Sequence, residues 1–179
     1  MVATILGTMP VVGFTDEAGI AATSHATAKA PIGAVYTAWD PATTQWSLIR
    51  YYQAGATILQ GDALVHDDTQ YKTYRLVRAS TANAGQLPRG FAAANVSNTA
   101  YYSFCYIAGY CPTIKYGSGP ASNQVCALSA SFTAGLTKFN CNATLGTSVA
   151  ATAFLACVYC LDVMTTTGVN SGIIQGFLL

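Results

Sequence analysis

Residues 87–111, LPRGFAAANVSNTAYYSFCYIAGYC, constrain the fold of this chain more than any other stretch. A Pro-Arg-Gly turn and a polar segment lead into positions 101–110, which hold five aromatic residues and no charge. With the period of two that a strand imposes, these positions divide into two faces, Tyr102, Phe104, Tyr106, Ala108 and Tyr110 on one and Tyr101, Ser103, Cys105, Ile107 and Gly109 on the other. The segment predicts a β-strand with two faces to cover.

Strand-like segments and turn residues alternate along the rest of the chain. Residues 35–39 and 46–53 flank an Asp-Pro turn and predict a hairpin, and Pro112 is expected to end the aromatic strand. Residues 149–164 are apolar on both faces, which favours a buried strand and leaves a short buried helix as the alternative. About ten short strands at roughly 8 to 12 residue spacing predict an all-β fold, a compact β-barrel or β-sandwich.

The two ends of the chain differ from this pattern. Residues 1–34 are rich in Ala, Thr, Gly and Val without a helical stripe, and they predict an extended N-terminal arm that lies along another surface. Residues 35–179 then form a single β-barrel or β-sandwich domain. The chain ends on apolar residues, which we expect to be docked because they would be a liability in water: Phe177, Leu178 and Leu179.

Charge is scarce in this chain. Charged residues make up 8% of the sequence, against roughly 25% in an ordinary soluble domain, and the net charge is +1. This balance argues against a nucleic-acid partner. The longest apolar run, residues 149–161, is shorter than the ~20 residues that cross a bilayer, which argues against a membrane partner. A surface so poor in charge favours a homo-oligomer, in which other subunits cover much of each chain.

The residues that most often carry chemistry do not form a known catalytic pattern. The six cysteines are expected to be reduced, small core residues: Cys105, Cys111, Cys126, Cys141, Cys157 and Cys160. The CxxC at 157–160 has no second pair or nearby histidine in sequence, so no metal site is expected. A hydrolase that uses His25 or His66 is the least favoured alternative, because no base and orienting carboxylate are patterned around either. We therefore expect no enzyme and no cofactor.

Basic residues gather in one short element. Residues 71–79, YKTYRLVRA, predict a strand that carries Lys72, Arg75 and Arg78. On an exposed edge such charges discourage open-ended sheet pairing. They equally suit contact with an acidic patch on a partner.

Four segments taken in order, GATILQGDALVHDD, YKTYRLVRAS, LPRGFAAANVSNTAYYSFCYIAGYC and CALSASFTAGLTKF, give the chain a family resemblance over residues 34–139. It resembles the small β-rich decoration (cement) proteins of tailed-phage heads. The matching residues are Gly61 and Asp62, Gly90 with Asn95 and Asn98, Tyr101 and Tyr102, and Gly109 with Tyr110. The resemblance implies a virion structural protein, often a trimer, that is assembled in the host cytoplasm. It would sit on the outer capsid surface and bridge neighbouring major capsid proteins.

Subunit or capsid contacts are expected from the arm, the basic strand, the aromatic segment and the C-terminus: Phe14, Arg75, Arg78, Arg89, Tyr101, Ile107, Phe177, Leu178 and Leu179. The alternative function is a carbohydrate- or receptor-binding β-module of a phage tail or fibre. In that case the aromatic residues of positions 101–110 would be a platform on which sugars stack.

Overall fold

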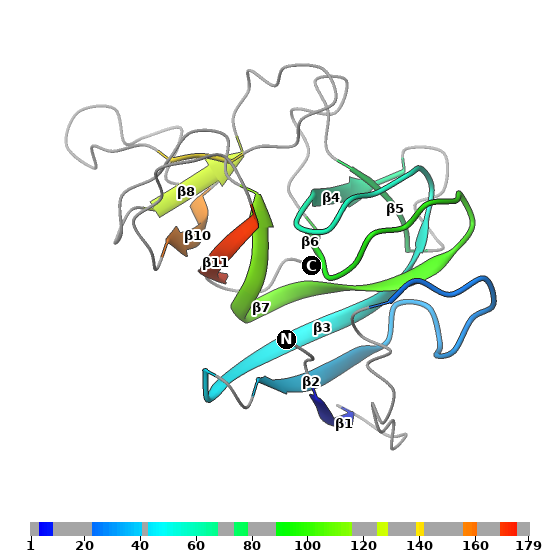
Figure 1. Ribbon diagram of the computed structural model, residues 1–179, viewed down its shortest axis with the longest axis horizontal. Coiled ribbons are helices and arrows are strands. Elements are labelled where there is room, and N and C mark those ends of the chain that lie inside the picture. Colours follow the sequence, from blue (N-terminus) through cyan, green and yellow to red (C-terminus); the bar gives the residue numbers. More distant parts are fainter. Residues whose placement is uncertain are drawn as a thin grey trace.

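The computed structural model describes residues 4–8, 23–40, 43–67, 74–78, 89–115, 125–128, 139–141, 156–160 and 169–174 (Figure 1). These residues form eleven β-strands and no helix, which confirms the all-β prediction. In chain order the strands are β1 (Thr4–Thr8), β2 (Val35–Asp40), β3 (Gln45–Ala54), β4 (Ala63–His66), β5 (Arg75–Arg78), β6 (Gly90–Ala92), β7 (Tyr102–Lys115), β8 (Val125–Leu128), β9 (Phe139–Cys141), β10 (Ala156–Cys160) and β11 (Val169–Ile174).

Five of the strands close into a ring. β3 pairs with β5 in parallel, and the remaining pairings, β5 with β4, β4 with β6, β6 with β7 and β7 with β3, are antiparallel. The expected hairpin is present, since Val35 to Asp40 of β2 pair in regular register with Arg50 to Gln45 of β3. β1 extends this side of the sheet by pairing with β2. On the other side the sheet continues from β7 through β11, β10 and β8 to β9.

β7 belongs to both parts of the sheet. Its first half lies between β3 and β6, so that Tyr106 is in register with Ile49 on one side and Phe91 on the other. Gly109 is in register with both Ser47 of β3 and Ile174 of β11. In Figure 1 the strand runs beside β3 and then bends to run with β11.

The expected end of the aromatic strand at Pro112 is wrong, because β7 continues to Lys115. Pro112 falls where the pairing of β7 with β11 changes register, between Asn170 and Gly172. A bulge tolerates proline because the missing N–H is not needed for the ladder there. β7 passes from its pairing with β3 to its pairing with β11 at Gly109, whose φ of +76° is a conformation that favours glycine.

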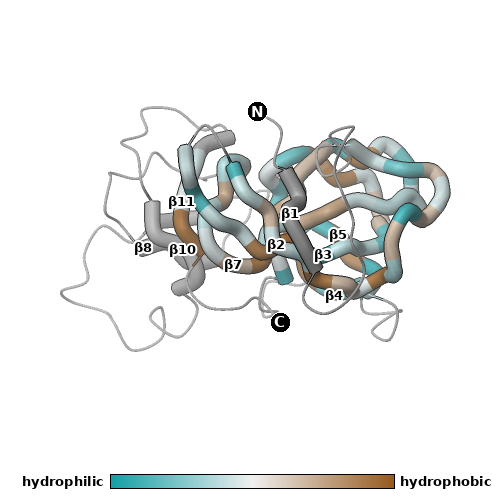
Figure 2. Tube along the Cα trace, turned by 90° about the horizontal axis from the view of Figure 1, so that it is seen from below, coloured by the Kyte–Doolittle hydropathy of each residue, from teal (hydrophilic) through white to brown (hydrophobic). Residues whose placement is uncertain are grey.

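The core fills the ring and covers both faces of the first half of β7. The largest fully buried side chains come from β3 to β7 and the turns between them: Tyr51, Tyr52, Phe91, Phe104, Ile49, Ile58, Leu64, Leu76 and Ile107. Figure 2 shows hydrophobic stretches recurring along the described strands and hydrophilic positions in the loops that connect them. The chain therefore covers both faces of its aromatic segment without help from a partner.

The described parts of the expected N-terminal arm lie on this chain's own strands. Residues 4–8 form β1, and His25 exchanges two backbone hydrogen bonds with Tyr102, of 2.8 and 2.9 Å. The hydroxyl of Ser103 donates to the carbonyl of Thr23 at 3.1 Å. Near the other end of the chain, β10 lies within residues 149–164 and confirms the strand prediction over the helix for residues 156–160.

Candidate functional site

The structure describes five of the nine residues expected to make subunit or capsid contacts. Arg75, Arg78, Arg89 and Tyr101 are partly exposed. Ile107 is fully buried in the chain's own core, which corrects the expectation that it contacts a neighbouring subunit. β3 and β6 flank this part of β7, so the chain's own ring of strands covers Ile107. The other four lie outside the described residues: Phe14, Phe177, Leu178 and Leu179.

Three predicted arginines lie on β5 or beside β4. Arg78 of β5 is in register with Leu64 of β4, and the backbone N–H of Arg89 donates to the carbonyl of Leu64 at 2.7 Å from the opposite side. Arg75, at the start of β5, forms an ion pair with Asp67 at 3.1 Å. β4 thus has Arg78 on one flank and Arg89 on the other. We call Arg75, Arg78 and Arg89, together with Arg50, the arginine cluster.

Arg50 belongs to this cluster although the sequence did not single it out. It lies on β3, is only 5% exposed, and places its guanidinium carbon 5.0 Å from the centre of the Tyr74 ring. Tyr74 has a φ of +46° and also packs 6.0 Å from the ring of His66. The available signal was a charged residue within an otherwise apolar and aromatic run. The Tyr74 ring thus holds the Arg50 guanidinium by a cation–π contact.

The pKa of His66 reflects the positive charge of the neighbouring arginines. Burial lowers the pKa of His66 below its usual value of 6.5, and the neighbouring Arg89 and Arg50 lower the pKa further. His66 therefore stays neutral near pH 7 beside two guanidinium groups. A positive field of this kind attracts a carboxylate.

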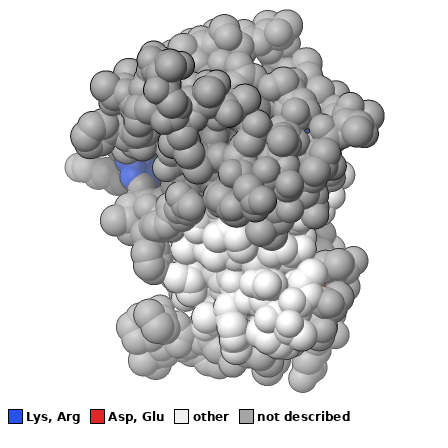
Figure 3. Space-filling model, turned by 90° about the vertical axis from the view of Figure 1, so that its left-hand side faces the viewer, with Lys and Arg blue, Asp and Glu red and all other residues white. Residues whose placement is uncertain are grey.

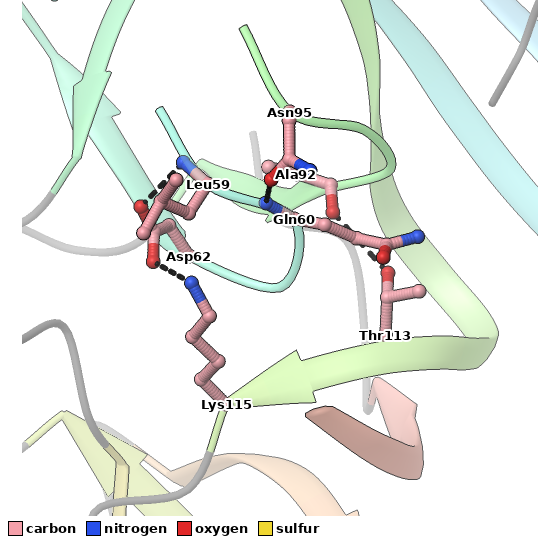
Figure 4. Close-up of polar contacts among 7 residues, drawn as sticks. All are labelled: Leu59, Gln60, Asp62, Ala92, Asn95, Thr113 and Lys115. Carbon is pink, nitrogen blue, oxygen red and sulfur yellow. Dashed lines mark hydrogen bonds and ion pairs between the residues drawn. The ribbon is translucent and has the colours of Figure 1, made fainter. Parts of the chain in front are cut away.

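A second polar network fixes the turn between β3 and β4 to the end of β7 (Figure 4). Asp62 accepts hydrogen bonds from the backbone N–H of Leu59 and from the Lys115 ammonium, both at 2.8 Å. Its side chain is 4% exposed, whereas that of Lys115 is 23% exposed. The backbone N–H of Gln60 donates to the Asn95 side chain at 2.8 Å. These contacts thus fix the expected Gly-Asp turn to the end of β7 and to the loop that follows β6.

The aromatic segment does not form the stacking platform proposed for sugars. Phe104, Tyr106 and Tyr110 are buried, and Tyr102 is stacked on Tyr51 with the ring centres 6.0 Å apart. This corrects the site proposed for the alternative function. An exposed aromatic pair instead lies at the end of the β2–β3 hairpin, where Trp39 and Trp46 are register partners with ring centres 4.8 Å apart. Trp46 is 52% exposed.

The histidine and thiol groups have structural contacts. His25 lies 3.2 Å from the Thr23 hydroxyl and 3.4 Å from that of Tyr51. Cys105 and Cys111 are free and buried, as predicted for small core residues, and burial raises the pKa of each thiol to about 12. In the part of the chain that the structure describes, no three His, Cys, Asp or Glu residues are placed to share a metal ion. Those same residues include no helix that is both long and apolar enough to span a membrane.

The fold and this surface define an all-β protein with a closed ring of strands, a buried acid–lysine clamp and a local arginine cluster. Figure 3 shows that the described part of one side of the molecule is almost entirely uncharged. No protein-family profile, curated protein or solved structure matches this chain.

Proposed function

We propose that this chain is a virion structural protein that decorates a tailed-phage capsid and stabilises it by bridging neighbouring major capsid proteins. It acts on the outer surface of the shell as a homo-oligomer, with a trimer favoured, and needs no cofactor and catalyses no reaction. The sequence resemblance over residues 34–139 supports this proposal, as do the compact β-fold and the low charge of the chain. Many copies that each bury apolar area at about 25 cal/mol per Å² strengthen a shell without covalent chemistry.

The arginine cluster is the observation that carries the proposal. Four of the chain's eight basic residues lie on or beside β3, β4 and β5, in a protein whose net charge is only +1. Arg75, Arg78 and Arg89 are partly exposed, and the guanidinium group pairs with carboxylates through two parallel hydrogen bonds. Such a concentration of guanidinium groups favours an acidic partner surface at these strands, while the uncharged described part of the side in Figure 3 suits contacts among subunits.

Charge reversal tests this proposal. In Arg78→Glu/Arg89→Glu, two partly exposed residues on either flank of β4 become negative. The matched control is Lys29→Glu, which reverses an exposed charge on the segment that precedes β2. Binding is measured to expanded capsids that lack decoration protein and are built from the major capsid protein encoded with this chain.

We expect the double variant to bind at least ten-fold more weakly than the control, with the wild-type affinity falling as salt rises. Circular dichroism checks that all three proteins are folded. Equal occupancy of capsids by the double variant and the control would show that the arginine cluster is not part of the interface. No binding of folded wild-type protein would refute the function itself.

The exposed tryptophan pair favours a second candidate, the carbohydrate- or receptor-binding module of a tail or fibre. Trp rings stack on the apolar faces of sugars, and Trp46 offers more than half of its surface. A glycan array distinguishes the two functions. Selective glycan binding by the wild type that Trp46→Ala loses would support the binding module. Binding of both wild type and Trp46→Ala to expanded capsids would support decoration.

A further inference from the structure

Four of the six cysteines lie on three adjacent strands at one end of the sheet. β9 carries Cys141, β8 carries Cys126, and β10 carries Cys157 and Cys160. The strands are neighbours in the order β10–β8–β9, at the end of the sheet farthest from β1 (Figure 1). Loops separate the three strands in sequence, so the common location of their cysteines is a result of the pairing.

The register selects one pair among them. Cys126 and Cys141 are direct partners in the antiparallel pairing of β8 with β9. On its other side Cys126 is in register with Val158, and Cys160 is in register with Gly172 of β11. Cys157 falls at the position where β10 has one residue more than β8. Of the pairings that involve these four residues, only that of β8 with β9 sets one cysteine against another among the described strands.

The spacing of direct antiparallel partners suits a disulfide. Their Cα atoms are about 4.5 Å apart in a non-hydrogen-bonded pair and about 5.5 Å apart in a hydrogen-bonded pair. Disulfides join residues whose Cα atoms are roughly 4.4–6.8 Å apart, so both kinds of pair fall within the range. The Cα spacing of these two positions is therefore compatible with a bond between them.

We infer that Cys126 and Cys141 form an intrachain disulfide when the folded protein meets a disulfide oxidant such as oxidised glutathione. One thiolate attacks a sulfur of glutathione disulfide, which forms a mixed disulfide and releases one reduced glutathione. The other thiolate then displaces the second glutathione, so that two thiols are oxidised and one glutathione disulfide is reduced. This inference goes beyond the expectation that the six cysteines are reduced, and it does not depend on the proposed function.

The bond would fasten an edge of the sheet. β9 is the last strand in the sheet order, and its described pairing is with β8 alone. A cross-link between positions 126 and 141 closes a loop of about 15 residues, a length at which disulfides stabilise folded proteins appreciably. Surfaces of virions and other extracellular environments are oxidising enough for such bonds to persist.

Peptide mapping of the wild-type protein tests the inference directly. The folded protein is incubated with oxidised glutathione, remaining thiols are alkylated, and the unreduced protein is digested with trypsin and chymotrypsin. Trypsin cleaves after Lys115 and Lys138 and so isolates Cys126, while chymotryptic cleavage after Leu145 or Phe154 separates Cys141 from the CxxC. We expect a linked pair of peptides that contain Cys126 and Cys141, two hydrogen masses lighter than their sum. Alkylation of both, or a link from either to Cys157 or Cys160, would overturn the inference.

Thermal unfolding gives a second measurement. Oxidised wild-type protein should melt about 5–10 °C above the same protein reduced with a phosphine, given the loop length and the size of the chain. Cys126→Ser/Cys141→Ser should lose this difference, while the control Cys157→Ser/Cys160→Ser should retain it. If both double variants lose the difference, the bond joins one cysteine of each pair; if only the control loses it, the bond lies within the CxxC. Either result would overturn the inference. If either serine variant fails to fold, the wild-type peptide map alone decides the outcome.

Discussion

The clamp between Asp62 and Lys115 predicts an asymmetry between its two partners. Removing the cation by Lys115→Met leaves a carboxylate that is 4% exposed and cannot be rehydrated. Removing the charge by Asp62→Asn keeps an oxygen that accepts from the Leu59 N–H and leaves a lysine that is 23% exposed and can reach water. Lys115→Met should therefore be the more damaging substitution, although both break the same ion pair.

The magnitudes follow from the burial of each partner. Breaking a buried ion pair from one side costs about 3–5 kcal/mol, and the partial exposure of Lys115 lowers this to about 3 kcal/mol for Lys115→Met. Asp62→Asn should cost about 1 kcal/mol, because its hydrogen bond to the backbone is kept. The double variant buries no charge, so it should cost about 2 kcal/mol less than the sum of the two single variants.

Urea unfolding followed by far-ultraviolet circular dichroism measures these differences, provided that the slope with urea is unchanged. In thermal melts Lys115→Met should lower Tm by about 6–12 °C for a chain of this size. The control, Lys29→Met, changes an exposed lysine and should alter stability by less than about 0.5 kcal/mol. Equal costs for Lys115→Met and Asp62→Asn, or strict additivity in the double variant, would refute the burial argument.

Three further predictions concern the backbone, pH and thiol reactivity. Gly109→Ala should cost at least about 2 kcal/mol in urea unfolding, because φ is +76° and a Cβ would lie 2.5 Å from the Trp46 carbonyl oxygen; a cost as small as that of Ala108→Gly would contradict this. His66 has a lowered folded pKa, so the unfolded chain binds its proton first as pH falls through 6.5, and stability should decline below that pH in the wild type but less in His66→Gln. Cys105 and Cys111, with thiol pKa values of about 12, should resist iodoacetamide at pH 8 until the protein unfolds, and mass spectrometry showing either alkylated in the native protein would oppose this.

Local patterns in the sequence predicted the strands but not what covers them. The alternation in residues 101–110 indicates two faces, and Ile107 was placed on the face expected to meet a partner. β3 and β6 flank this part of β7, and the ring closes around it, so Ile107 and Cys105 are buried within the chain. Periodicity reports that a face is apolar, whereas burial by the same chain depends on pairings between residues far apart in sequence.

The candidate site was predicted in part for the same reason. Arg75 and Arg78 stand in one basic strand, which made them recognisable, and Arg89 follows a Pro turn. Arg50 joins them only because β3 pairs with β5, in the sheet's one parallel contact among the described strands. The register of Cys126 with Cys141 is likewise set by a pairing and not by any spacing motif.

The double membership of β7 has a mechanical consequence. A force that pulls on β8 to β11 reaches the ring through β7, whose hydrogen bonds to β3 run from Ser47 to Gln53. A pull along the strand axis loads those bonds together, in shear, whereas a pull across it would open them one after another. Because β7 passes from β3 to β11 at Gly109, the direction of the strand beyond this residue determines how far such a pull acts in shear.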